Sequence, residues 1–313
     1  MIITGNQGLS IKIPVIQKYD SLLRLRLIRR RFRRLLQSYR FSAEALAQSP
    51  VFFANSFPKS GTHLLTQILS GFTRIGPAVN SGLPAVITFR GDTGEKRSEI
   101  EIIRDLDRLL PGDIAYGHLH ASPENVNFLC TGRFATYFIL RDPRDVVISH
   151  AHYLTQMALS HIHHVYYKET LNNFDERVCT SIVGLQNTTQ NDGVNGVNNV
   201  YFPDIRERFR PYMGWLAQPE VLSLHFEDFI NQPHEMIAST LEHAVKRGFI
   251  LQHPKTECIQ TIAHGIDPKR SPTYRSGKIG EWRTGFSEQN KLAFKDVAGD
   301  LLVQLGYEKD FNW

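Results

Sequence analysis

Apolar residues in this chain gather in short runs that alternate with helical patterns. Runs of this kind occupy residues 52–57, 113–120, 134–140 and 221–228, and each predicts a strand. After the first run and a short turn, apolar residues recur on one helical face, namely Leu64, Leu65, Ile68, Leu69 and Phe72. Helical patterns also follow the runs that end at 140 and 228. This alternation predicts an α/β fold with a parallel sheet and helices on both faces.

The turn after the first run, Pro58-Lys59-Ser60-Gly61-Thr62, has the composition of a phosphate-binding loop. The first amides of a helix lack intrahelical partners and carry the positive end of its dipole, so they attract phosphate. Lys59 adds a charge, Ser60 and Thr62 add hydroxyls, and Gly61 permits close approach of the backbone. In the ATP-binding P-loop, by contrast, the lysine follows the glycine. An ordinary strand-to-helix turn with a solvated lysine is the alternative interpretation.

Two later loops have similar chemistry. Arg141 follows the strand at 134–140 and Ser149 lies in the next helix, and a guanidinium with a hydroxyl suits a phosphate. The two arginines and two aspartates at 141–145 could equally form a self-contained cluster of salt bridges. Residues 274–283 combine three cations with two glycines, which favours backbone amides held against an anion. Plain surface charge is the alternative for that loop.

Two histidines, His118 and His120, come at the end of the strand at 113–120. Open α/β sheets bind ligands at the carboxyl ends of their strands, although an isolated histidine is often structural. Side chains two residues apart share one face of a strand, so alternation does not separate the two. The histidines between 150 and 164 lack acidic partners and predict a polar lid rather than a metal site. Residues 187–200 predict a polar loop rich in Asn and Gly.

Composition limits the class of protein. The 313 residues are 42% hydrophobic and 21% charged, which is ordinary for a soluble globular chain. A net charge of +5 favours anionic ligands but falls short of that of a nucleic-acid coat protein. Cys130, Cys179 and Cys258 are widely separated, so neither a disulfide framework nor a zinc site is indicated. With no signal peptide or membrane-spanning run in evidence, a cytoplasmic protein is predicted.

Residues 1–45 lack the alternating pattern and predict a basic arm before a single domain at 46–313. Seven arginines lie between Arg24 and Arg34, and apolar residues interleave with them at helical spacing. A basic amphipathic helix packed on the domain is one interpretation. The candidate partner of Arg24–Arg34 is an anionic membrane surface or an acidic polymer, and nucleic acid is not expected. In the first case the protein would be peripheral to a membrane.

Together, the loops at 58–63, 141–149 and 275–285 resemble, in order and spacing, the nucleotide-binding elements of sulfotransferases that use 3'-phosphoadenosine 5'-phosphosulfate (PAPS). Residues 58–62 are similar to the family's 5'-phosphosulfate loop, and Arg141 with Ser149 to its 3'-phosphate pair. Residues 275–287 are similar to its Arg-Lys-Gly, Gly-Asp-Trp-Lys and Phe-Thr segment. The resemblance covers about residues 50–308. It implies a three-layer sandwich around a parallel sheet of about five strands, similar to the P-loop nucleotide kinases.

The chain departs from the family pattern at three places. Ser276 replaces the usual lysine, and Phe226 stands where many members have a tyrosine that touches the adenine. His63 and Leu64 replace the Thr-Trp pair that follows the loop in cytosolic small-molecule members, so the resemblance does not imply adenine stacking by that tryptophan. The resemblance implies the following nucleotide-binding residues: Lys59, Ser60, Gly61, Thr62, His63, Arg141, Ser149, Phe226, Arg275, Ser276 and Gly277.

The resemblance implies transfer of a sulfuryl group from PAPS to an acceptor hydroxyl, or an amine, by in-line displacement without a metal. Lys59 would neutralise charge on the leaving oxygen, and His118, aligned with the family's catalytic histidine, would take the acceptor's proton. Its unperturbed pKa of about 6.5 would suit that task. Ser149 and Arg141 would bind the 3'-phosphate, while Arg275 and Gly277 would close over it.

The sequence does not name the acceptor, which could be a lipid, glycan, phenol or peptide. The polar segments at 150–165 and 187–200 are expected to border it. A nucleotide-dependent kinase of P-loop type is the alternative function, although the lysine order is reversed and no magnesium-binding aspartate follows a strand. A non-catalytic anion-binding module that works through the arginine-rich helix is a third possibility.

Overall fold

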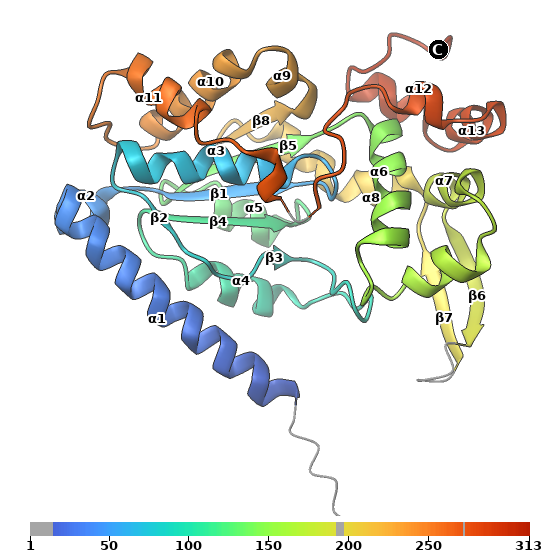
Figure 1. Cartoon of the computed structure of the whole chain (residues 1–313), viewed down its shortest axis with the longest axis horizontal. Helices are drawn as coiled ribbons and strands as arrows, with labels where there is room; N and C mark the ends of the chain where they lie inside the picture. Colours follow the sequence, from blue (N-terminus) through green and yellow to red (C-terminus); the bar gives the residue numbers. More distant parts are fainter. Residues whose placement is uncertain (1–14, 192–196, 272) are drawn as a thin grey trace, which may run out of the picture.

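The computed structural model describes residues 15–191, 197–271 and 273–313, and a parallel sheet lies at its centre (Figure 1). The strand order is β2-β4-β1-β5-β8, and β3 also pairs with β4. The strands are β1 Val51–Ser56, β2 Val79–Asn80, β3 Val86–Ile87, β4 Asp113–His118, β5 Phe134–Leu140 and β8 Val221–His225. All of these pairings are parallel. The predicted sheet of about five parallel strands is confirmed.

Helices cover both faces of this sheet, as Figure 1 shows. They are α1 Val15–Phe41, α2 Ala43–Gln48, α3 Thr62–Ile75, α4 Glu99–Asp107, α5 Pro123–Leu129, α6 Pro143–Gln156, α7 Phe174–Val183, α8 Ile205–Phe209, α9 Phe226–Asn231, α10 Pro233–Lys246, α11 Lys255–Ala263, α12 Trp282–Gly285 and α13 Glu288–Gln304. Short π and 3₁₀ segments lie at Tyr166–Thr170, Arg210–Ala217 and Pro268–Arg270. None of the described helices has the length and apolar composition that a membrane span requires.

The sheet separates two hydrophobic cores. Phe52 and Phe53 are adjacent on β1, both are fully buried, and they belong to different cores. Successive side chains of a strand point to opposite faces, so one strand supplies both layers. α3, α10 and α11 cover the face of Phe52, and α4, α5 and α6 cover that of Phe53. The result is the three-layer sandwich that the resemblance implied.

A two-stranded antiparallel hairpin stands apart from the main sheet. β6 (Leu185–Asn191) pairs with β7 (Val197–Phe202). The prediction of a loop at 187–200 is therefore wrong for the described part of that segment. Backbone hydrogen bonds form the ladder without an apolar pattern, and the buried Leu185 and Phe202 anchor its base against Tyr166. That anchor, rather than the polar residues beyond it, is the sequence signal for the hairpin.

α1 runs along one side of the domain and is attached mainly by its arginines. Arg30 and Arg34 donate to opposite oxygens of the buried Asp113, at 3.0 and 3.1 Å. Asp113 is the first residue of β4, and burial raises the pKa of its carboxyl against the opposing effect of the two guanidiniums. The helix thus packs on the domain, as one of the two interpretations held. The division of the chain into an N-terminal arm at 1–45 and a single domain at 46–313 stays a prediction.

Candidate active site

The loop between β1 and α3 combines unusual backbone geometry with an unpaired hydroxyl. Lys59 and Gly61 both have left-handed backbones, with φ of 70° and 99°. A Cβ on Gly61 would lie 2.6 Å from Cδ2 of Phe226, so only glycine fits there. The Ser60 hydroxyl is buried and finds no hydrogen-bond partner within the described residues. A non-glycine residue held in this conformation and an unsatisfied buried donor both indicate a site built to hold something.

His118, the last residue of β4, is held by Ser56 at the end of β1. Its Nδ1 lies 3.1 Å from the backbone oxygen of Ser56 and 3.0 Å from the Ser56 hydroxyl, which also contacts the Thr62 hydroxyl at 2.6 Å. A carbonyl oxygen can only accept, so this contact places the proton on Nδ1 and leaves Nε2 as the proton acceptor.

The charge of His118 is strongly disfavoured. Burial, with the nearby His63 and Lys59, lowers the pKa of His118 to about 4. The expectation of an unperturbed pKa near 6.5 is therefore wrong, because the ring is buried and lies near the Lys59 ammonium. The imidazole is neutral at pH 7, the form in which it can accept a proton.

The structure separates His118 from His120 where strand alternation could not. β4 ends at His118. The Asn55 side chain accepts from the backbone N–H of Leu119 at 2.8 Å and donates to its backbone oxygen at 3.0 Å, where the chain leaves the strand. The His120 ring instead packs edge-on against Tyr212, with ring centres 4.8 Å apart. Burial lowers its pKa to about 4 as well.

Three cationic side chains converge beside the loop. Burial, together with the charges of Arg141 and Arg275, lowers the pKa of Lys59 to about 8. The Lys59 ammonium also lies 4.2 Å from the centre of the Tyr153 ring, on α6. Mutual repulsion among three cations is relieved when an anion binds between them. The arrangement is that of an anion receptor at the N-terminus of α3.

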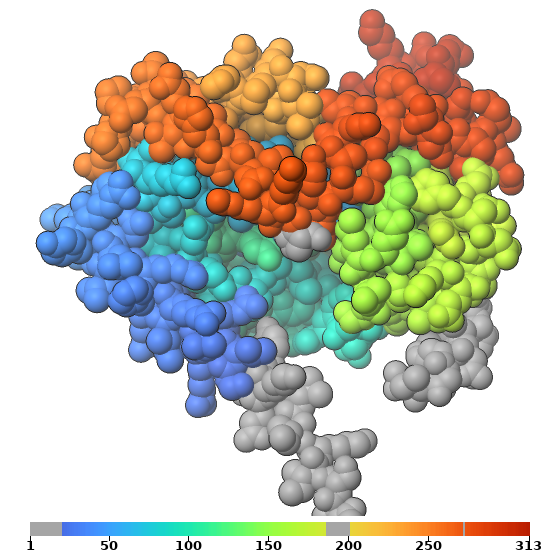
Figure 2. All heavy atoms as spheres, viewed as in Figure 1, coloured from blue at the N-terminus to red at the C-terminus, as the bar shows by residue number. Residues whose placement is uncertain are grey.

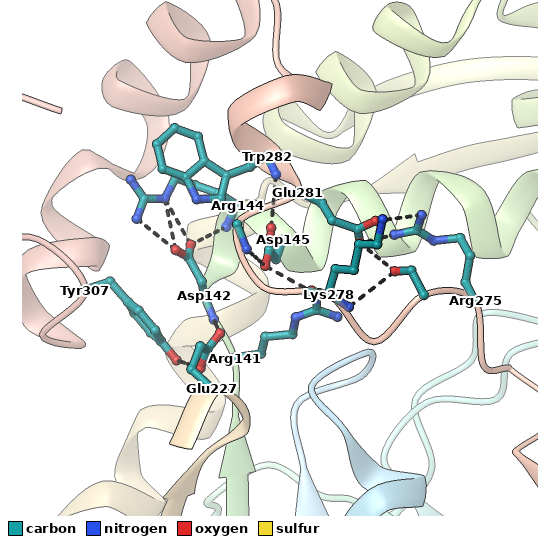
Figure 3. A network of polar contacts seen from close by, with 12 residues as sticks. Arg141, Asp142, Arg144, Asp145, Glu227, Arg275, Lys278, Glu281, Trp282 and Tyr307 are labelled. Carbon is teal, nitrogen blue, oxygen red and sulfur yellow. Dashed lines mark hydrogen bonds and ion pairs between the residues drawn. The ribbon is translucent and has the colours of Figure 1, made fainter. Parts of the chain in front are cut away.

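Arg141 is held from several sides (Figure 3). One of its nitrogens donates to the backbone oxygen of Lys278 at 2.6 Å and pairs with Asp145 at 3.3 Å. The guanidinium lies 4.6 Å from the centre of the Phe226 ring. Its Nε is buried and has no partner in the described part of the chain. Arg141 therefore keeps an unused buried donor at Nε.

The loop that follows Arg275 is closed by two carboxylates. Asp145 accepts from the backbone N–H groups of Gly280 at 2.8 Å and Trp282 at 3.0 Å. Glu281 accepts from both nitrogens of the Arg275 fork and, at 2.9 Å, from the Ser276 hydroxyl. Two of the side chains predicted to bind nucleotide are thus engaged by Glu281. Gly277, with a φ of 65°, supplies a left-handed turn between Ser276 and Glu281.

The arginines and aspartates at 141–145 also form the salt-bridge cluster considered as the alternative. Arg144 pairs with Asp142 at 2.8 Å and with Glu308 at 2.6 Å, and it contacts the rings of both Trp282 and Trp313. The Arg144–Glu308 ion pair joins α6 to the C-terminal part of the chain. Arg141 is the member of the cluster that also faces Lys59.

Ser149 is half-buried on α6, and its hydroxyl makes no hydrogen bond within the described residues. Helical spacing of four residues puts Asp145, Ser149 and Tyr153 on one face of α6. Asp145 contacts Arg141 and Tyr153 lies under Lys59, so Ser149 lies between the partners of the two cations. The structure thus gives Ser149 a place along the same face.

The predicted polar lid of histidines is wrong for three of its members. His150, His163 and His164 are buried, and their ring nitrogens contact the Ser181 hydroxyl at 3.1 Å and the backbone oxygens of Tyr201 and Leu154 at 3.2 and 2.6 Å. They join α6 to α7 and the hairpin. No cluster of three metal-ligating side chains occurs in the described residues.

Sequence reasoning missed Asn55, Ser56, Tyr153 and Glu281. Asn55 and Ser56 carried a usable signal, because they are polar residues at the carboxyl end of an otherwise apolar, fully buried strand. Tyr153 carried none, since its contact with Lys59 joins segments far apart in the sequence. Glu281 lies only five and six residues from its partners Ser276 and Arg275, but the sequence does not show that the loop folds back on itself.

Comparison with known proteins gives one family. The family model described as sulfotransferase domain matches residues 50–306. The structure of the mouse sulfotransferase SULT7A1 complexed with PAP matches with a TM-score of 0.52 at 15% identity, over 86% of this chain and 92% of that one. Retinol dehydratase with androsterone and inactive cofactor PAP matches with 0.52 at 16% identity, over 82% and 83%. Retinol dehydratase with retinol and PAP does so over 82% of each chain, also with 0.52 at 16%. No curated protein matches by sequence.

Proposed function

Because the chain belongs to the sulfotransferase domain family, we propose that it moves a sulfuryl group from PAPS to an acceptor hydroxyl, or an amine, and releases PAP. The observation that carries the assignment of roles is the convergence of Lys59, Arg141 and Arg275 beside the N-terminus of α3. The likeness to structures that hold PAP supports the choice of donor.

The residues present fit such a donor. Ser60 Oγ and Arg141 Nε are buried donors without partners among the described residues, and the first amides of α3 point out of the same loop. The loop residues Lys59 to His63 take the 5'-phosphosulfate. Arg141 and Ser149 take the 3'-phosphate, with Arg275, Ser276 and Gly277 closing over it. Phe226, whose ring lies 4.6 Å from the Arg141 guanidinium, would contact the adenine.

Lys59 stabilises the negative charge that grows on the leaving oxygen. With a pKa of about 8 it is mostly protonated at pH 7, and a bound anion strengthens that protonation. The donor supplies an activated sulfuryl group, so the protein's task is to hold it in line with the acceptor and to neutralise charge.

His118 takes the acceptor's proton at Nε2 while Ser56 holds Nδ1. Burial opposes the imidazolium that forms. Negative charge bound beside Lys59 would raise the pKa of His118, because it stabilises a nearby cation. Proton transfer is thereby coupled to the presence of the donor.

We propose a hydroxyl-bearing compound as the acceptor, without a narrower class. Retinol dehydratase, a structural neighbour, holds retinol and androsterone. A cytoplasmic location is also part of the proposal, supported by the free thiols of Cys130, Cys179 and Cys258. Nothing in the geometry favours the kinase or the non-catalytic module.

The test is transfer of radiolabel from PAPS to a panel of lipid, phenol, glycan and peptide alcohols, with calorimetry of PAP and AMP beside it. Transfer to a member of the panel, and tighter binding of PAP than of AMP, are expected. Charge-assisted hydrogen bonds to the extra phosphate contribute about 1.5–3 kcal/mol each before desolvation. Equal affinities for PAP and AMP, or transfer from ATP instead, would overturn the proposal.

A further inference from the structure

α1 presents an apolar face to solvent. We call this face the outer stripe and define it as Leu25, Ile28, Phe32, Leu35, Leu36 and Tyr39. Ile28, Phe32 and Leu35 are 61%, 62% and 66% exposed. At 3.6 residues per turn the stripe spans an arc of about 100°. α1 lies on the outside of the molecule (Figure 2), and these six exposed side chains share one face of it.

The other face of α1 carries the charges that attach it. Arg30 and Arg34 pair with the buried Asp113, and Arg33 donates to the backbone oxygen of Asn80 at 2.9 Å. A surface helix normally buries its apolar stripe and exposes its charges. Here, among the described residues of α1, only Leu23 and Leu27 pack partly against the core, while the outer stripe stays exposed and is free to contact a membrane or another protein.

Three further arginines line the edges of the outer stripe. Arg24 and Arg31 fall on one edge and Arg29 on the other, and all three are exposed. None of them makes an ion pair or side-chain hydrogen bond within the described residues. Residues 21–41 contain no Asp or Glu, so the exposed face carries positive charge alone.

We propose that this face of α1 lies on an anionic membrane, with the outer stripe at the boundary of the acyl chains and Arg24, Arg29 and Arg31 at the headgroups. An apolar stripe flanked by basic residues is the pattern of helices that lie in the plane of a membrane interface. A second copy of this chain is a poorer occupant, since its arginines would face these. The inference goes beyond the proposed function and does not rest on it.

The experiment is flotation of the full chain with vesicles of phosphatidylcholine, with and without phosphatidylserine. Binding is expected only to the anionic vesicles, and it should weaken with salt because exposed charges are screened over about 10 Å at 0.1 M. A basic residue near such a surface contributes about fivefold in binding, so replacing Arg24, Arg29 and Arg31 with Gln should cost on the order of 10²-fold.

The apolar arm of the experiment uses the combined substitutions Ile28→Ser, Phe32→Ser and Leu35→Ser. The matched control is Ile100→Ser with Leu292→Ser, two side chains that are 73% and 69% exposed elsewhere. The stripe variant should lose at least tenfold in vesicle binding and the control none, with unchanged thermal unfolding in both.

Several results would overturn the proposal: no binding of the unaltered chain to anionic vesicles, equal binding by the stripe variant, or a dimer in ultracentrifugation that the stripe variant abolishes. The last would assign the stripe to a second copy. Turnover of a water-soluble acceptor should be the same in all variants, which keeps this test separate from that of the transferase.

Discussion

His118 Nδ1 lies 3.1 Å from the backbone oxygen of Ser56, which fixes the tautomer of the ring from the end of a neighbouring strand. A main-chain oxygen cannot be removed by substitution of Ser56. The orientation of the imidazole is therefore a property of the β1–β4 pairing, in which Asn55 lies opposite Gly117.

Replacing His118 with Ala should lower kcat by roughly 10²- to 10⁴-fold, because a positioned general base contributes about that much. PAP affinity and the melting temperature should stay close to those of the unaltered protein. His120→Ala should cost much less, since its ring lies in an aromatic cluster with Tyr212. Steady-state kinetics on both variants checks this, and a dead His120 variant beside an active His118 variant would move the base to His120.

The pH profile of kcat/KM should reflect two shifted groups. With a pKa of about 4, His118 stays deprotonated as the pH falls, so activity should persist down to about pH 6, where an ordinary histidine would be charged. With a pKa of about 8, Lys59 loses its proton at higher pH, so activity should decline above that value. The alkaline decline should vanish in Lys59→Ala. An acid limb centred near 6.5 would contradict the assignment.

Lys59→Ala should reduce the rate of the chemical step more than donor affinity, because the charge that Lys59 meets appears only as the bond breaks. A loss of about 10²- to 10³-fold in kcat is expected, as for a donor aimed at a developing oxyanion. Lys59→Arg should recover only part of it, since a planar guanidinium is a poor substitute for a compact ammonium. Single-turnover rates and PAP binding separate the two effects. Weaker PAP binding with an unchanged rate would make Lys59 a binding residue.

Glu281→Gln should tighten PAP binding, because the carboxylate now holds Arg275 and Ser276, which are proposed to meet the 3'-phosphate. A partly exposed ion pair contributes up to about 1 kcal/mol, so a gain of at most about fivefold is expected. Glu288→Gln, which removes a surface partner of Lys291, serves as the matched control and should change nothing. Weaker PAP binding in Glu281→Gln would show that Glu281 organises Arg275 instead.

The sheet and the phosphate loop could be predicted because their signals are local. Apolar runs mark the strands, and the helix pattern from Leu64 to Phe72 follows the turn directly. The side of α1 that packs on the domain could not be predicted, since amphipathic spacing identifies two faces without saying which one lies inward. That choice is made by Asp113, a single buried carboxylate far along the chain. The shifted pKa of His118 was likewise hidden, because burial is a property of the assembled fold.

The contact of Arg144 with both Trp282 and Trp313, whose ring centres lie 3.9 and 4.6 Å from its guanidinium, has an optical consequence. The chain has three tryptophans, and the third, Trp215, is fully buried and donates to the backbone oxygen of Leu119 at 2.8 Å. Trp282 and Trp313 thus lie at the base of the loop from Arg275 to Gly285, and Trp215 contacts Leu119, next to His118. Intrinsic fluorescence can therefore follow movement of that loop during nucleotide titration, without an attached dye.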